Sequence, residues 1–248
     1  MEIMISRILR YLNGCLDDDH MYRIGNFIVK HYTQMQNYDL DTFLAEGHFR
    51  KSEFYDFVEH LGYDSFENFQ ERLLADHALR LSQIHARMLN IDETSFLRHL
   101  DVTCTSEALL SLIDQICDMI FHKQRVVVVG ALYPRSVSVD FQTDMITLGK
   151  EVVEYHQFDQ NFRFGEDDLV VFITATGRTM ESYVEELVDQ GICAADILLI
   201  TQNDKYREYK NLCADEVIHV LGKFDSLQFN YQTMMILDLI RVRYYQNY

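Results

Sequence analysis

The stretch DLVVFITATGRT, residues 168–179, decides the fold of this chain. Its first part, Leu169 to Ile173, is an unbroken apolar run, which is typical of a strand buried on both faces of a sheet. The residues from Thr174 to Thr179 are small or polar, and helical periodicity begins at Met180. The sequence therefore predicts a strand, a tight turn and the start of a helix in direct succession.

This turn has the chemistry of an anion site. The first N–H groups of a helix lack intrahelical partners and lie at the positive end of the helix dipole. Gly177 permits a close backbone approach, and the hydroxyls of Thr174, Thr176 and Thr179 can donate to phosphate oxygens. Arg178 can add positive charge. For an isolated turn, the commoner role of such threonines is only to cap a helix.

The chain around this turn alternates between strands and helices. Apolar strand-like runs and helical patterns follow one another from residue 107 onward, which predicts a parallel sheet covered on both faces. The expected strands are 126–129, 152–155, 169–174, 197–201 and 217–221, and the expected helices are 107–122, 135–148, 180–190, 206–213 and 226–245.

The first part of the chain lacks β-branched runs and reads as helices at 22–35, 40–46, 52–61 and 66–89. We therefore expect a helical domain over residues 1–90, a connection over 91–105 and an α/β domain over 106–248.

Composition limits the possible functions. The formal net charge is −17, and residues 1–90 hold 9 Lys or Arg against 14 Asp or Glu, so neither part is basic as a nucleic-acid-binding domain usually is. Five scattered cysteines, no zinc spacing, no signal peptide and no long apolar run predict a cytoplasmic protein without metal or cofactor.

Residues 168–179 resemble the signature of SIS (sugar isomerase) domains, in which a strand ends in Ser-x-Ser-Gly-x-Thr. Thr174 and Thr176 take the places of the two serines, and Gly177 and Thr179 match. The resemblance covers about residues 105–245 and implies a three-layer α/β domain with a five-stranded parallel sheet that binds phosphosugars. Further landmarks are RVVVVG at 125–130, Asp140, Leu148-Gly149, Ile200-Thr201 and Ala214-Asp215.

One loop departs from the family pattern. The family's first loop reads Gly-x-Gly-x-Ser, whereas this chain has Gly130-Ala131-Leu132-Tyr133-Pro134, so that Pro134 replaces the phosphosugar-contacting serine. Arg135 or Ser136 can replace that contact. The ligand-binding residues implied by the resemblance are Thr174, Ala175, Thr176, Gly177, Arg178, Thr179, Tyr133, Arg135 and Ser136.

The N-terminal part, with LGYDSFENF at 61–69, resembles the helix-turn-helix domain of RpiR-type regulators, which precedes a SIS domain in that family. The implied DNA contacts are Arg50, Lys51, Ser52 and Tyr55. Arg50 and Glu53 stand where the family has Ser and Thr, and Asp56 stands where it has Arg. Carboxylates at these positions repel DNA phosphates.

The resemblance implies a phosphosugar-responsive, DNA-binding transcriptional regulator of carbohydrate genes, acting as a homodimer or homotetramer without a catalytic step. One alternative is a phosphosugar-binding SIS protein whose helical domain no longer binds DNA. Another is a sugar-phosphate isomerase, for which Glu151, Glu154, His156 and His219 are available as acid or base.

Overall fold

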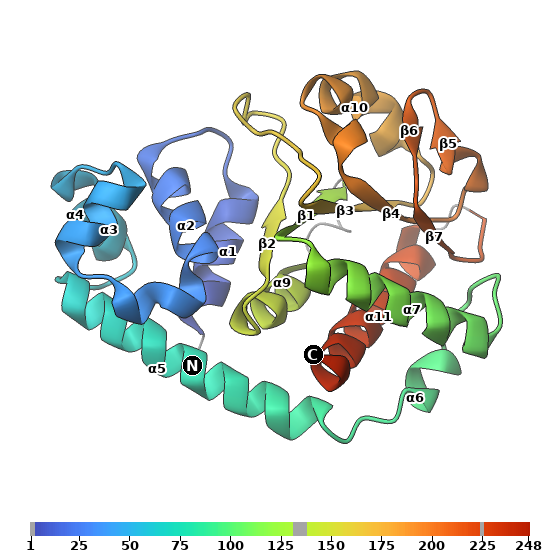
Figure 1. Cartoon of the computed structure of the whole chain (residues 1–248), viewed down its shortest axis with the longest axis horizontal. Helices are drawn as coiled ribbons and strands as arrows, with labels where there is room; N and C mark the ends of the chain where they lie inside the picture. The colour runs from blue at the N-terminus through green and yellow to red at the C-terminus, as the bar shows by residue number, and fades with distance from the viewer. Residues whose placement is uncertain (1–2, 131–137, 224–225) are drawn as a thin grey trace.

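The apolar runs form one parallel sheet of five strands in the order β2-β1-β3-β4-β7 (Figure 1). Its strands are β2 (Glu151–Glu154), β1 (Arg125–Gly130), β3 (Asp168–Thr174), β4 (Asp196–Thr201) and β7 (Glu216–His219). The computed structural model describes residues 3–130, 138–223 and 226–248. Every residue of β3 is buried, as a central strand with both faces covered requires.

Helices cover both faces of the sheet. The side chains of Val126, Val128 and Val171 belong to one core with α7 (Ser106–His122), α9 (Ser138–Thr147) and α11 (Ser226–Asn247). The alternate residues Val127 and Phe172 belong to a second core with α10 (Arg178–Asp189). The predicted three-layer α/β arrangement with a five-stranded parallel sheet is confirmed.

The connection between β4 and β7 differs from its prediction. The helix expected at 206–213 is wrong: this segment contains η3 (Asp204–Tyr206) and the antiparallel pair β5 (Glu208–Tyr209) and β6 (Leu212–Cys213). Lys210 lies between them with a left-handed φ of 54°. Of the helix expected at 135–148, residues 135–137 lie outside the described residues.

The N-terminal part is α-helical. Three of its helices begin at a side-chain cap, because Asp19, Asp39 and Ser65 accept hydrogen bonds from backbone N–H groups in the first turn. The elements are α1 (Met4–Gly14), α2 (His20–Lys30), η1 (Tyr32–Asn37), α3 (Leu40–Gly47), α4 (Lys51–His60) and α5 (Phe66–Met88).

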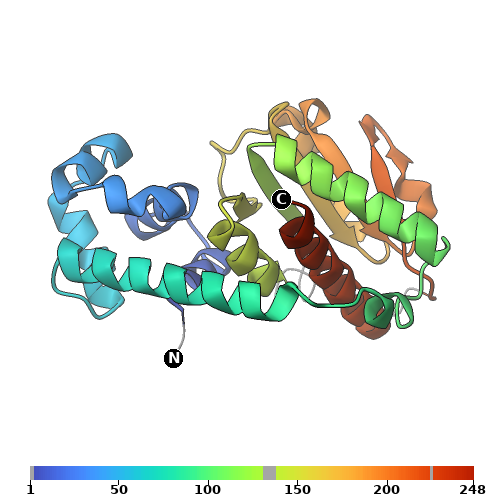
Figure 2. The same ribbon diagram turned by 60° about the horizontal axis from the view of Figure 1, so that its bottom comes forward.

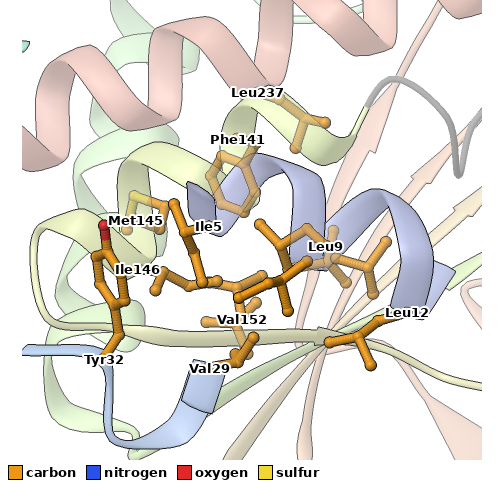
Figure 3. Close-up of a cluster of buried hydrophobic side chains, with 14 of the residues drawn as sticks. Ile5, Leu9, Leu12, Val29, Tyr32, Phe141, Met145, Ile146, Val152 and Leu237 are labelled. Atoms are coloured by element: carbon orange, nitrogen blue, oxygen red, sulfur yellow. The ribbon is translucent and has the colours of Figure 1, made fainter. Parts of the chain in front are cut away.

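Helix α1 connects the helical part to the α/β part, and the sequence did not predict it. Its N-terminus has no cap from a neighbouring residue; instead Asp76 on α5 accepts from the Met4 N–H at 2.8 Å. The buried side chains of Ile5 and Leu9 pack against Phe141 and Met145 of α9 (Figure 3). The two parts therefore share one hydrophobic core.

The remaining elements lie in the connections. The 3-10 turn η2 (Ile192–Ala194) precedes β4, and the short helix α6 (Thr94–Leu97) lies between α5 and α7, at the end of the molecule opposite α3 and α4 (Figures 1 and 2). After α6, Val102 forms an antiparallel bridge with Val220, directly beyond β7. Within the described ranges no helix has the length and apolar character needed to cross a membrane.

Candidate functional site

The turn at Thr174–Thr179 lies at the carboxyl end of β3, beside the end of β1. The chain adds β2 on one side of β1, and then adds β3 and β4 on the other side. The direction in which successive strands are added to the sheet therefore reverses between β1 and β3. In open parallel sheets, ligands bind outside the carboxyl ends of the strands at this reversal. The turn therefore occupies the position where a ligand site is expected from topology alone.

Hydrogen bonds within the turn fix its backbone. The Gly177 N–H donates to Thr174 Oγ1 at 3.0 Å, and the Arg178 N–H donates to Thr176 Oγ1 at 3.4 Å. Gly177 has a left-handed φ of 86°. Both threonine oxygens act as acceptors inside the turn, and each hydroxyl keeps its hydrogen for donation to a ligand.

The next two backbone N–H groups are donors for which the described part of the chain offers no acceptor. Gly177 is the N-cap of α10 and has no side chain to cap the helix. Among the residues that the structure describes, the N–H groups of Thr179 and Met180 have no hydrogen-bond acceptor, while the Glu181 N–H already donates to the Gly177 carbonyl. Such donors at a helix N-terminus are suited to an anion.

Two residues after β4 hold the turn in place, and the sequence did not single them out. Asn203 Nδ2 donates to the Thr176 carbonyl at 3.2 Å. The ring of Tyr206 lies against Gly177, where an added Cβ would be only 1.7 Å from the ring. The Tyr206 hydroxyl donates to Glu181, and this bond lowers the pKa of the Glu181 carboxyl below its usual value.

The predicted ligand residues fall into two groups. Thr174, Gly177 and Thr179 are buried, Ala175 and Thr176 are half-buried, and Arg178 is exposed at the start of α10. The structure thus gathers these six residues in one turn. Tyr133, Arg135 and Ser136 of the preceding loop lie outside the described residues.

The four acid or base candidates have other surroundings. Glu151 lies at the start of β2, away from the carboxyl edge, where burial raises its pKa. Glu154 accepts from Ser138 Oγ at 2.9 Å, and His156 stacks on Phe158 with ring centroids 5.0 Å apart. His219 Nδ1 lies 3.0 Å from Asp204. None of the four contacts the turn through a hydrogen bond that the described residues form.

The predicted DNA contacts lie together at the start of α4. Arg50, Lys51 and Ser52 are exposed and Tyr55 is half-buried. Arg50 is already paired, because its Nη2 lies 2.6 Å from Glu53 Oε1, and this pair lowers the pKa of Glu53 to about 2. On the next turn of the helix, Asp56 lies 2.7 Å from His20 Nε2. The four residues thus lie next to carboxylates.

No group of three or more His, Cys, Asp or Glu side chains with metal-binding geometry occurs in the described part of the chain. That part contains five free cysteines.

Comparison with known proteins gives a remote likeness only. A scan against protein-family models and a search of curated proteins found no match. Among solved structures, the Vibrio vulnificus NanR protein, solved with ManNAc-6P, is 11% identical, with a TM-score of 0.42, over 97% of this chain and 90% of that one. A putative sugar-phosphate isomerase from Listeria monocytogenes is 15% identical, with a TM-score of 0.44, over 71% of this chain and 92% of that one.

A third structure, a Methanococcus jannaschii protein with an inferred 3-hexulose-6-phosphate isomerase function, is 15% identical, with a TM-score of 0.44. It matches over 56% of this chain and 79% of its own length.

Proposed function

We propose that this protein is a sugar-phosphate-binding regulator whose ligand phosphate sits on the turn at Thr174–Thr179. The observation that supports it most strongly is the pair of N–H donors on Thr179 and Met180, which have no acceptor among the described residues and lie at the strand-order reversal of the sheet. A phosphate dianion accepts from both, and from the hydroxyls of Thr176 and Thr179. Arg178 supplies charge from the exposed side.

The ligand would act on the helical part through α9. This helix is the next described element after β1, and a ligand bridging the ends of β1 and β3 would act on its start. Helix α9 also packs on α1 and α5 of the helical part. Binding that shifts α9 therefore changes the equilibrium between arrangements of the two parts.

This mechanism contains no catalytic step. We assign no acid or base role to Glu154 or His156, because Glu154 accepts a hydrogen bond from Ser138, while His156 stacks on Phe158 and meets the Tyr22 ring edge-on. Both nevertheless follow the carboxyl edge of β2, so a panel of aldose and ketose phosphates should be tested for interconversion. Turnover would support the isomerase function instead.

Transcriptional control through DNA is the more specific form of the proposal. Arg50, Lys51, Ser52 and Tyr55 would contact the phosphates, and paired subunits would present two such helices. The ion pair of Arg50 with Glu53, and Asp56 on the next turn, favour the second candidate, a regulator that binds the sugar phosphate but not DNA. Retardation of the gene's own upstream DNA at low salt, lost in Lys51→Glu, would decide for DNA binding.

Thermal-shift titration with sugar phosphates tests the ligand site. A ligand at 100 times its Kd stabilises the folded protein by about 2.7 kcal/mol, whereas the unphosphorylated sugar should not. The double variant Thr176→Ala plus Thr179→Ala should lose this stabilisation, while the exposed Thr103→Ala should keep it. Equal affinity in the double variant would place the ligand elsewhere.

A further inference from the structure

A cavity lies between the two parts of the molecule, lined by α5, α9, α11 and the segment that follows α5. Its volume is about 160 Å³. Its lining shares no residue with the turn at 174–179, so it needs an explanation of its own.

One side of the cavity is apolar. Ile84 and Met88 of α5 and Val242 of α11 are buried at 1%, 5% and 2% exposure, and together they form a small core separate from the two large ones. Ile91 packs against this core. This wall can take an alkyl group.

The other side is charged, and its centre is Asp144 of α9, which is completely buried. Arg80 of α5 donates to Asp144 Oδ1 from Nε at 2.7 Å, and Arg241 of α11 donates to Oδ2 from Nη1 at 2.8 Å. Two guanidinium groups from different parts of the molecule therefore share one carboxylate, and the surroundings of this carboxylate have excess positive charge.

The rest of the lining leaves the cavity with a net positive charge, because Asp238 balances the excess around Asp144 and Arg87 adds one more guanidinium group. Asp238 pairs with the same Arg241, whose Nη2 lies 2.8 Å from Asp238 Oδ1. Arg87, exposed on α5, forms no ion pair or hydrogen bond with any residue in the described ranges. The cavity is thus lined by three guanidinium groups, from Arg80, Arg87 and Arg241, and two carboxylates.

We propose that this cavity binds a small monocarboxylate with a short apolar chain, a branched or straight acid of roughly six non-hydrogen atoms. Its carboxylate pairs with Arg87, and its alkyl group lies against Ile84, Met88 and Val242. The size follows from the volume, because a cavity of about 150 Å³ holds a benzene molecule. The sign of the ligand's charge follows from Arg87, which lines the cavity and has no carboxylate partner among the described residues, because a guanidinium group binds a carboxylate through charge-assisted hydrogen bonds.

This site would be a second input, independent of the sugar-phosphate site. The carboxylate would contact α5 of the helical part while its chain contacts α11 of the α/β part. A bound acid stabilises the arrangement in which these two helices stay together.

Isovalerate and two close analogues test the ligand class. We expect isovalerate at millimolar concentration to raise the melting temperature above that in equal sodium chloride. Isovaleramide lacks the charge and should have no effect, and valine, whose ammonium group faces guanidinium groups, should bind more weakly. Tighter binding of valine or the amide than of isovalerate would overturn the proposal, as would the absence of a shift with every short-chain acid.

Two variants locate the site. Arg87→Met should weaken isovalerate binding about tenfold, because it removes a charged hydrogen-bond partner. Arg98→Met, an exposed arginine outside the cavity, is the charge-matched control and should bind normally. Val242→Phe should block the apolar wall. Unchanged isovalerate affinity in Arg87→Met would overturn the assignment, even if Val242→Phe failed to fold. Loss of isovalerate binding in Arg98→Met would show a nonspecific charge effect and would overturn it too.

Discussion

At the scale of single residues, the contact between Gly177 and Tyr206 determines the shape of the candidate phosphate turn. Gly177 has the φ of 86° that side chains disfavour, and the Tyr206 ring fills the space beside its Cα. The turn therefore excludes a side chain at this position for two reasons, backbone conformation and packing.

Replacement of Gly177 by alanine should destabilise the protein by at least ~1–3 kcal/mol, because the left-handed backbone alone costs this much. The added Cβ would also force the ring away. Urea unfolding measures the loss. Gly165→Ala is the control, because no atom lies within 4 Å of its Cβ position. An unchanged unfolding midpoint in Gly177→Ala would contradict this account.

The turn itself could be predicted from its residues, but its supports could not. Thr174 to Thr179 are consecutive, so sequence pattern and topology agree on them. Asn203 follows β4, which lies next to β3 in the sheet. The adjacency of these two strands was the one signal that could have placed Asn203 beside the turn. Tyr206 gave no signal: with Tyr209 and Cys213 it has helical spacing, yet the segment forms a hairpin and the Tyr206 ring packs on Gly177.

At the scale of elements, the strands were predicted more fully than the helices. A buried strand is visible as a continuous apolar run, whereas helix α1 begins at Met4 and its N-cap residue, Ile3, provides no side-chain cap. Its cap is Asp76, 72 residues away, and no rule based on neighbouring residues finds such a partner.

The end of helix α2 should respond to pH through His31. Its Nδ1 lies 3.1 Å from the Tyr38 hydroxyl, and burial lowers its pKa below the ordinary value. The unfolded chain therefore takes up the proton first. The contribution of neutral His31 to the stability of the folded protein is fully present above about pH 6.5. It is lost as the pH falls from there toward the lower pKa of His31 in the folded state.

We expect the free energy of unfolding to fall more between about pH 7.5 and about pH 5.5 in the wild type than in His31→Gln. Urea titrations at the two pH values measure the difference. Equal slopes in the wild type and His31→Gln would rule out His31 as the titrating group.

Asp144 joins three helices, and its loss should be costly. Asp144→Ala leaves the half-buried guanidinium groups of Arg80 and Arg241 without this partner, which should destabilise the fold by about 3–5 kcal/mol. Asp118→Ala, at an exposed carboxylate, should cost about 0.5 kcal/mol or less. Chemical denaturation of both variants compares them. A small loss in Asp144→Ala would mean that water replaces the carboxylate.

At the scale of the whole molecule, the shared core predicts that the helical and α/β parts unfold together. Leu9→Ala removes a side chain with 1% exposure at their junction and should cost about 2–5 kcal/mol. Hydrogen exchange should then rise equally in α4 and α5 and in β3 and β4. A rise confined to one part would show that they unfold separately. Leu16→Ala, 88% exposed, serves as the control.

The segment that connects the two parts also seals one edge of the sheet. Val102 pairs with Val220, the Thr103 N–H donates to His219, and the Leu221 N–H donates to Asp101, so these backbone groups beside β7 have partners. At the other edge, α2 packs against the short strand β2. An exposed sheet edge is a template for pairing with a strand of another molecule. A nick in the connecting segment would therefore uncover β7 and make the protein prone to edge-to-edge aggregation.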